Sequence, residues 1–259
     1  MPFIETGELR THYSLTGDQE PVLLFSNSLG TDFSMWDPQM PELQPRSRIL
    51  RYDTRGHGQS SVTPGDYTID QLGRDVISLL DALRLDRVNF CGLSMGGMIG
   101  MWLGIYAPGR VHRLVLCNTA ALIGTKEIWN ARIATTRKDN GMKSVAAAVI
   151  ERWFTPEFRA SSPEKVARAQ QMLENSPPYG YAACCAAIRD MDQRESVAQI
   201  KTPTLVIYGA KDPVTPAADA HFLAGQIRGA AEVELDAAHL SNVEQSAAFT
   251  EAVSNFLSE

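Results

Sequence analysis

A pentapeptide near the middle of the chain, Gly92-Leu93-Ser94-Met95-Gly96, has the pattern G-x-S-x-G. An apolar, strand-like run (residues 87–91) precedes it, and a helix-length run (residues 97–107) follows it. Strand, tight turn and helix in this order predict a nucleophile elbow, where a serine hydroxyl lies at the apex of a strained turn. We therefore interpret Ser94 as a catalytic nucleophile. The alternative is a glycine-rich turn that happens to contain a serine.

The backbone near this turn is suited to binding a developing oxyanion. The helix behind Ser94 presents free N–H groups and a partial positive charge at its N-terminus, so the N–H of Met95 is one expected donor. The second donor is expected from the loop after the apolar run 22–25. Leu29 is the candidate there, because Gly30 lets the loop approach closely.

Composition excludes several classes of protein. The chain has 259 residues, 44% of them hydrophobic, a net charge of −6 and a pI of about 5.4. It has no basic stripe, so neither nucleic acid nor an anionic membrane is an expected partner. Neither a leader segment nor a membrane-spanning run is recognisable, which indicates a cytoplasmic protein. The four cysteines and five histidines lack metal-binding spacing, and we expect no metal.

Apolar runs alternate with helical patterns along most of the chain. The runs expected to be strands are residues 22–25, 48–52, 87–91, 114–117, 204–208 and 231–235, after an opening hairpin over residues 4–16. This alternation predicts the α/β class, with a mostly parallel central sheet and helices on both of its faces. Ligands of such folds bind beyond the carboxyl ends of the strands.

The character of the sequence changes between residues 120 and 200. Strand-like runs vanish there, and four helices are expected at residues 125–138, 143–154, 163–173 and 180–191. We interpret residues 120–200 as a helical cap inserted into a core made of residues 1–119 and 201–259. One closing helix is expected over residues 241–257.

A serine nucleophile needs a base and an acid that orients the base, and in this fold they follow in the order serine, acid, histidine. Asp212 is the first carboxylate after the strand 204–208 and is the expected acid, with Asp219 as the fallback. His239 follows the last strand and is the expected base. His57 is its rival, but it precedes the serine and is expected to have a structural role within its own turn.

The chain resembles the α/β-hydrolase superfamily over essentially its whole length. The resemblance rests on D-x-R-G-x-G-x-S at residues 53–60, G-x-S-x-G-G at residues 92–97, Y-G-x-x-D at residues 208–212 and the late His239. Many relatives have His-Gly where this chain has Asn27-Ser28. More narrowly, the chain is similar in sequence to the 3-oxoadipate enol-lactonases of the β-ketoadipate pathway. This similarity lies in residues 26–31, 35–36, 51–58 and 180–190.

The narrower resemblance implies a small anionic lactone as substrate, hydrolysed through an acyl-enzyme without a cofactor. An anionic substrate calls for a basic group near the pocket. Arg132 and Arg189 are the candidates, with Trp129 and Trp153 as pocket walls, although each arginine could instead be a solvated charge on a helix and each tryptophan could serve in packing. The oligomeric state stays open, and a homo-oligomer is possible.

Two other functions fit the same motifs. One is another hydrolase of small carboxylic esters or of C–C bonds, or a perhydrolase, acting through the same triad. The other is a hydrolase-fold ligand receptor in which slow chemistry serves signalling. A substrate panel separates the first from an enol-lactonase, and fast multiple turnover excludes the second.

Overall fold

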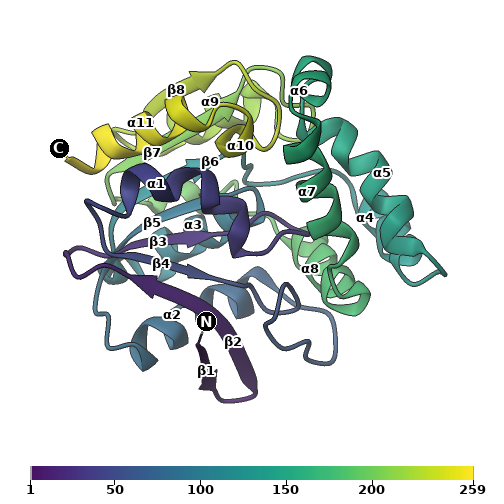
Figure 1. The fold of residues 1–259 in the computed structure, drawn as a ribbon. Helices are drawn as coiled ribbons and strands as arrows, with labels where there is room; N and C mark the ends of the chain where they lie inside the picture. The colour runs from purple at the N-terminus through teal and green to yellow at the C-terminus, as the bar shows by residue number, and fades with distance from the viewer. Residues whose placement is uncertain (1, 259) are drawn as a thin grey trace.

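The computed structural model describes residues 2–258, which form an eight-stranded sheet covered by helices (Figure 1). In chain order the strands are β1 (Phe3–Thr6), β2 (Leu9–Thr16), β3 (Leu23–Ser26), β4 (Ile49–Tyr52), β5 (Val88–Leu93), β6 (Val111–Cys117), β7 (Thr204–Gly209) and β8 (Ala231–Leu235). Their order across the sheet is β1-β2-β4-β3-β5-β6-β7-β8. β1 and β2 pair antiparallel and β2 pairs antiparallel with β4, whereas all later pairs are parallel. The predicted α/β class and mostly parallel sheet are confirmed.

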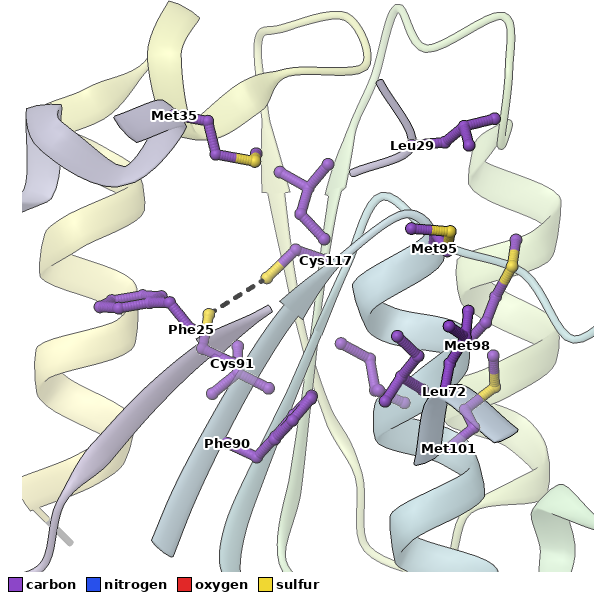
Figure 2. Packing of buried hydrophobic residues seen from close by; sticks show 14 of the residues in the cluster. Phe25, Leu29, Met35, Leu72, Phe90, Cys91, Met95, Met98, Met101 and Cys117 are labelled. Atoms are coloured by element: carbon purple, nitrogen blue, oxygen red, sulfur yellow. Dashed lines mark hydrogen bonds between the residues drawn. The ribbon is translucent and has the colours of Figure 1, made fainter. Parts of the chain in front are cut away.

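Helices cover both faces of the sheet. The core helices are η1 (Phe33–Gln39), α1 (Met40–Leu43), α2 (Ile69–Ala82), α3 (Met95–Tyr106), η2 (Pro108–Arg110), η3 (Val197–Gln199), α9 (Ala217–Gln226), α10 (Ser241–Glu244) and α11 (Ser246–Ser258). α3 packs against β3, β5 and β6 with α2 beside it, whereas α11 lies with η1 and α1 on the opposite face (Figure 2). No helix of residues 2–258 is long and apolar enough to span a lipid bilayer.

The centre of the sheet is buried on both faces, which explains its continuous apolar runs. Every residue of β5 and of β7 is buried. Cys91 in β5 and Cys117 in β6 face each other with their sulfur atoms 3.8 Å apart (Figure 2). Residues 95–104 of α3 are also buried throughout, so the helix behind the elbow is fixed between the sheet and α2.

Five α-helices lie between β6 and β7 and gather at one end of the molecule (Figure 1). They are α4 (Lys126–Thr136), α5 (Gly141–Trp153), α6 (Pro156–Ser161), α7 (Pro163–Glu174) and α8 (Pro178–Asp190). The sequence predicts four, because the dipeptide Thr155-Pro156 is typical of a break between helices. Thr155 instead caps α6, since its hydroxyl accepts a hydrogen bond from the Phe158 N–H at 3.2 Å, and proline is tolerated at the first helical position.

The single closing helix predicted over residues 241–257 is wrong, because the chain leaves the helical conformation at Gln245 (φ −117°, ψ 50°). The side chains at the break and just before it bind the loop that carries His239. Gln245 donates to the Asp236 carbonyl at 3.0 Å, and Glu244 accepts from the Ala238 N–H at 3.0 Å. The break therefore attaches α10 to the end of β8.

Candidate active site

Ser94 lies on the strained turn that the G-x-S-x-G pattern predicts. Its φ of 57° and ψ of −115° are unusual for a residue with a side chain, and α3 begins at the next residue. Hydrogen bonds to the N–H and to the carbonyl of Ser94 hold this strained conformation. The Ser94 N–H donates to the Cys117 carbonyl at 2.9 Å, and the Ser94 carbonyl accepts from the Thr119 hydroxyl at 2.8 Å.

The two glycines of the motif are needed for close backbone contacts. A Cβ added to Gly92 would lie 2.2 Å from the Gly96 carbonyl oxygen, and one added to Gly96 would lie 2.1 Å from the carbonyl oxygen of Ser26. Such distances are far inside van der Waals contact. The elbow therefore requires glycine at both positions for β3, β5 and α3 to meet.

Asp212 follows β7, and its carboxylate is bound at both oxygens. One oxygen accepts from the Val214 and Thr215 N–H groups at 2.7 and 3.2 Å. The other accepts from the Thr215 hydroxyl at 2.7 Å, from Asn118 Nδ2 at 2.9 Å and from His239 Nδ1 at 2.8 Å. Burial raises the pKa of this carboxyl group, but the charge and hydrogen bond of His239 and the Asn118 and Thr215 donors outweigh burial. The net pKa of Asp212 lies below its ordinary value.

His239 lies in the loop between β8 and α10, with its side chain almost wholly buried. Because Asp212 holds Nδ1, the other ring nitrogen, Nε2, is the one left for a base, and His239 lines the same cavity as Ser94. In the described chain no hydrogen bond joins the Ser94 hydroxyl to this ring, and such bonds often tighten only with substrate. Asp219, the fallback acid, lies in the first turn of α9 and makes no ion pair with His239 within residues 2–258.

The loop after β3 leaves one backbone N–H free beside Ser94. The Ser28 N–H donates to the Met35 sulfur at 3.4 Å, the Gly30 N–H donates to His57 Nε2 at 2.8 Å, and the Thr31 N–H donates to the Ser28 carbonyl at 3.2 Å. The Thr31 hydroxyl donates to the same carbonyl at 2.8 Å. Within residues 2–258 the Leu29 N–H has no such partner, and it points away from Thr31 because it is trans to the Ser28 carbonyl.

Asn27 explains how the loop keeps its shape without the His-Gly pair of many relatives. Its amide nitrogen donates to the Tyr52 carbonyl at 2.8 Å, and its amide oxygen accepts from Trp36 Nε1 at 2.9 Å. Asn27 thus fixes the end of β3 to β4 and η1. The hydrogen bonding that the sequence leaves undetermined is satisfied by neighbours in the core.

The pocket above Ser94 is small and mixed in character. Its lining combines groups from the loop after β3, the elbow, α4, α5, α8 and the two late loops, namely Ser28, Leu29, Ser94, Met98, Ile123, Trp129, Arg132, Val149, Arg152, Trp153, Tyr181, Ile188, Val214 and His239. The cavity volume is about 30 Å³. The structure therefore brings Trp129, Arg132 and Trp153 together with Ser94 and His239.

Arg189, by contrast, is absent from this lining. Its guanidinium is bound to Asp190 at 2.6 Å and to Asp66 at 3.3 Å, and it also donates to Asn130 at 3.1 Å. Two carboxylates already neutralise this charge, so the structure does not bring Arg189 together with Ser94 and His239 as it does Arg132.

Arg152 is a second pocket arginine, and it was not among the residues predicted to contact the substrate. Val149, Arg152 and Trp153 lie three and four residues apart, so α5 presents all three to the pocket, and this spacing was the available signal. Neither Arg132 nor Arg152 forms an ion pair with a residue of the described chain. Burial and the charge of Arg132 lower the pKa of Arg152. The pocket thus holds two guanidinium groups that no carboxylate of the described chain neutralises.

No group of three or more His, Cys, Asp and Glu side chains within residues 2–258 is arranged to hold a metal ion. The chemistry that the site offers is that of a buried carboxylate and histidine, a serine on a strained turn, and two free N–H groups at Leu29 and Met95. These groups suit nucleophilic attack on a carbonyl.

Known proteins share this architecture and much of the sequence. The model of the alpha/beta hydrolase fold family matches residues 21–246. Two Acinetobacter baylyi proteins, 3-oxoadipate enol-lactonase 2 and 3-oxoadipate enol-lactonase 1, are 45% identical over 247 residues and 42% identical over 240 residues. These alignments cover 95% and 93% of this chain, and 92% and 90% of the two relatives.

Solved structures agree with this assignment. The enol-lactonase from Burkholderia xenovorans LB400 superposes with a TM-score of 0.97 at 44% identity, covering 100% of both chains. A hydrolase from Pseudomonas aeruginosa PA01 superposes with a TM-score of 0.96 at 46% identity, covering 100% of this chain and 98% of that one. The chain therefore belongs to the α/β-hydrolase fold family and, within it, resembles the 3-oxoadipate enol-lactonases over nearly its whole length.

Proposed function

We propose that this chain is a serine hydrolase that opens 3-oxoadipate enol-lactone to 3-oxoadipate in the catabolism of aromatic compounds. The observation that carries the proposal is its 45% identity, over 95% of the chain, to a protein named for that activity. Support comes from the site, where a serine, a histidine and a carboxylate meet in the order that the fold uses.

In the proposed reaction, His239 Nε2 takes the proton of the Ser94 hydroxyl as the serine oxygen attacks the lactone carbonyl. The ionised Asp212 stabilises the resulting imidazolium through Nδ1. The Leu29 and Met95 N–H groups stabilise the oxyanion of the tetrahedral intermediate. Collapse of the intermediate breaks the ring C–O bond and leaves an acyl group on Ser94. The departing enolate takes the proton of the imidazolium, which returns His239 to its neutral form, and the enol becomes a ketone, which disfavours ring closure.

Hydrolysis of the acyl-enzyme uses the same groups a second time, with water in place of the serine hydroxyl as the nucleophile. His239 takes a proton from water, and the resulting hydroxide attacks the acyl carbonyl. The serine oxygen leaves and recovers its proton from the imidazolium, so that 3-oxoadipate is released and Ser94 is restored. One water is consumed and one C–O bond of the lactone is cleaved, and the reaction needs no cofactor.

Arg132 and Arg152 are proposed to bind the carboxylate that the enol-lactone carries on its side chain. Both line the pocket and neither has a carboxylate partner in the described chain. Trp129 and Trp153 are proposed as the apolar walls beside the ring. Arg132 is already fixed by Trp129, because its guanidinium carbon lies 4.9 Å from the indole centroid.

The helices α4 to α8 are proposed to act as a cap over the site. This division assigns residues 120–200 to the cap, and residues 1–119 and 201–259 to the hydrolase core. The cap supplies the arginines and tryptophans, whereas the core supplies the nucleophile, base, acid and oxyanion donors.

A cytoplasmic location is proposed as well, since Cys91, Cys117, Cys184 and Cys185 are all free thiols.

The test is hydrolysis of the enol-lactone and of a neutral ester, p-nitrophenyl acetate, by purified variants. Ser94→Ala is expected to abolish both activities without unfolding the protein. Arg132→Gln and Arg152→Gln are each expected to raise KM for the enol-lactone about 10-fold to 100-fold, because a hydrogen bond to a charged group contributes about 1.5–3 kcal/mol. Hydrolysis of the neutral ester should change little.

Arg137→Gln provides the matched control, because Arg137 lies just after α4 and is exposed. It should leave both reactions unchanged. Turnover by Ser94→Ala at the native rate would exclude the triad. Equal loss on both substrates in the pocket-arginine variants would exclude recognition of the substrate carboxylate by these residues.

A further inference from the structure

His57 is a buried histidine that the proposed mechanism leaves without a role. It lies in the D-x-R-G-x-G-x-S loop after β4, and its exposed fraction is 0%. As predicted from the sequence, it is bonded within its own turn, where its backbone N–H donates to the Thr54 carbonyl at 2.9 Å and its Nδ1 lies 3.4 Å from the Arg55 carbonyl oxygen. Its Nε2 also accepts the N–H of Gly30, in the loop after β3, at 2.8 Å. Gly30 directly follows Leu29, the proposed oxyanion donor.

The protonation state of this ring follows from its surroundings. Burial lowers the pKa of His57 to about 4, so the ring is neutral near pH 7. A neutral imidazole that accepts at Nε2 carries its proton on Nδ1. That nitrogen lies 3.4 Å from the Arg55 carbonyl oxygen and 3.8 Å from the Cys184 sulfur, both of which can accept. The ring therefore has one defined tautomer, with its lone pair directed at Gly30.

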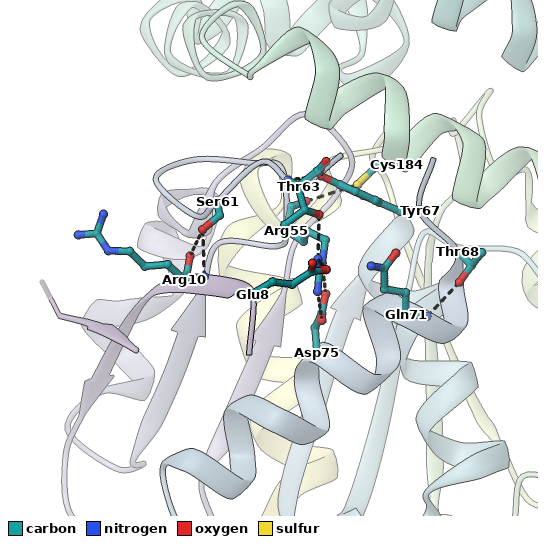
Figure 3. A network of polar contacts seen from close by, with 10 residues as sticks. All are labelled: Glu8, Arg10, Arg55, Ser61, Thr63, Tyr67, Thr68, Gln71, Asp75 and Cys184. Carbon is teal, nitrogen blue, oxygen red and sulfur yellow. Dashed lines mark hydrogen bonds and ion pairs between the residues drawn. The ribbon is translucent and has the colours of Figure 1, made fainter. Parts of the chain in front are cut away.

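The loop behind His57 is fixed by a network of charged and polar groups (Figure 3). The Arg55 guanidinium donates to both carboxylate oxygens of Asp75 at 2.8 and 2.6 Å. It also donates to Glu8 at 3.0 Å and to the Thr63 hydroxyl at 2.8 Å. α2 and the β1–β2 hairpin thus hold Arg55, whose carbonyl faces the Nδ1 side of His57.

The loop after β3, which carries the proposed oxyanion donor Leu29, has few other restraints near Gly30. The peptide before Leu29 is fixed through the Ser28 carbonyl by Thr31, and the peptide after Leu29 is fixed through the Gly30 N–H by His57. Gly30 has a φ of +81°, in the region that favours glycine, so only its contacts select that conformation. The Gly30 carbonyl accepts from the Ser176 hydroxyl at 3.2 Å on the next peptide.

We infer that His57 is a positioning residue for the oxyanion hole: its neutral ring anchors the Gly30 N–H and so directs the Leu29 N–H at the reacting carbonyl. The inference rests on the proposed function, because it gives His57 a purpose only if Leu29 stabilises an oxyanion. Without the acceptor, the Gly30 N–H would be buried and unpaired. The peptide would then rotate to find another partner and would turn the neighbouring donor away.

The test compares His57→Leu with His57→Gln. Leucine is similar in size to the imidazole but accepts no hydrogen bond, whereas the glutamine amide oxygen can reach the Gly30 N–H. We expect His57→Leu to lower kcat about 10-fold to 100-fold, which is less than the full loss of an oxyanion donor, and to leave KM nearly unchanged. His57→Gln should recover most of this loss.

A second measurement separates positioning from packing. An alkyl boronic acid forms a tetrahedral adduct with an active-site serine and places a charged oxygen in the oxyanion hole, whereas 3-oxoadipate forms no such adduct. His57→Leu should weaken boronate binding by about the same factor as kcat and leave 3-oxoadipate binding unchanged. Cys184→Ala is the control, since it removes packing on the opposite side of the ring, and it should leave both affinities near those of the native protein.

Equal weakening of boronate and product by His57→Leu, or equal kcat in the leucine and native proteins, would overturn the inference. Proton–nitrogen correlation spectra of the native protein test it even if the leucine variant does not fold. They should show His57 protonated at Nδ1 alone near neutral pH, and a protonated Nε2 would exclude the bond to Gly30. Ser94→Ala run in parallel distinguishes the failures, because its retention of activity would refute the proposed function itself.

Discussion

The Asp212 carboxylate shows how single residues prepare this site. Its donors come from distant parts of the chain: Asn118 follows β6, Thr215 precedes α9, and His239 precedes α10. Each bond selects the ionised form, and together they lower the pKa of a carboxyl group that burial alone would raise. A charge held in this way can stabilise the imidazolium of His239 without becoming protonated itself.

Thr215→Val tests this arrangement, because it removes the hydroxyl that donates to Asp212 at 2.7 Å and keeps the shape of the side chain. The other donors remain, so we expect kcat to fall about tenfold, near the low end of the 1.5–3 kcal/mol of a hydrogen bond to a charged group. KM should change little. Steady-state kinetics with the enol-lactone provide the measurement.

Thr204→Val is the matched control for that substitution. Thr204 is also buried, but its hydroxyl donates to the Thr202 carbonyl at 2.7 Å, away from the site. The control should lose some stability, because a buried hydrogen bond is removed, yet keep the native kcat. An equal fall of kcat in both variants would mean that loss of stability, and not support of Asp212, explains the effect.

At the scale of elements, the meeting of β3, β5 and α3 determines whether the elbow can form. Gly96 lies where α3 touches β3, and its added Cβ would lie 2.1 Å from a backbone oxygen, which cannot rotate away as a side chain could. Gly225 lies in α9, and an added Cβ there meets nothing within 4 Å. The same substitution should therefore have opposite effects in the two helices.

We expect Gly96→Ala to lower the free energy of unfolding by about 3 kcal/mol, the upper range for overpacking, and to abolish activity. Gly225→Ala should raise it by up to about 1 kcal/mol, because alanine is the better helix former. Urea unfolding with a common slope gives both values. Similar stability of the two variants would show that the elbow can shift to accept a side chain.

The elements marked by continuous apolar runs were predictable from the sequence. The elements that depend on a single capping or bridging side chain were not. The apolar runs that became β5 and β7 are buried at every position, so packing enforces what the pattern indicates. α6 is six residues long and depends on Thr155 and Pro156, which read equally well as a break. The break at Gln245 depends on its bond to Asp236, a contact that no local pattern encodes.

At the scale of the whole molecule, the order of motifs predicted which core residues come together. The fold brings Ser94, Asp212 and His239 together from three separate loops, because parallel strands place their carboxyl ends at one edge of the sheet. The choice between cap arginines was not predictable in this way. Arg152 faces the pocket and Arg189 faces two aspartates, and helix packing in three dimensions decides between them.

The narrow pocket implies that the helices α4 to α8 and the core must move apart to admit a lactone. The space of about 30 Å³ is what is open to the centres of water-sized molecules and holds few of them, whereas the lactone has about ten non-hydrogen atoms. The junction of α5 and α6 is tied to the core, since the Leu240 N–H donates to the Trp153 carbonyl at 3.0 Å and Thr155 bonds to Glu244. α4 packs instead on α5 and α8.

We therefore expect α4 to open while residues 153–155 stay attached to α10. In hydrogen exchange, the amides of α4 in the free protein should exchange faster than those of β5 and β6, and saturating 3-oxoadipate should slow them by closing Arg132 onto the ligand. Arg132→Gln is the control, since it should lose this protection. If 3-oxoadipate does not change the exchange rates of the α4 amides, and residues 153–155 exchange faster than α4, the moving part lies at the junction of α5 and α6 instead.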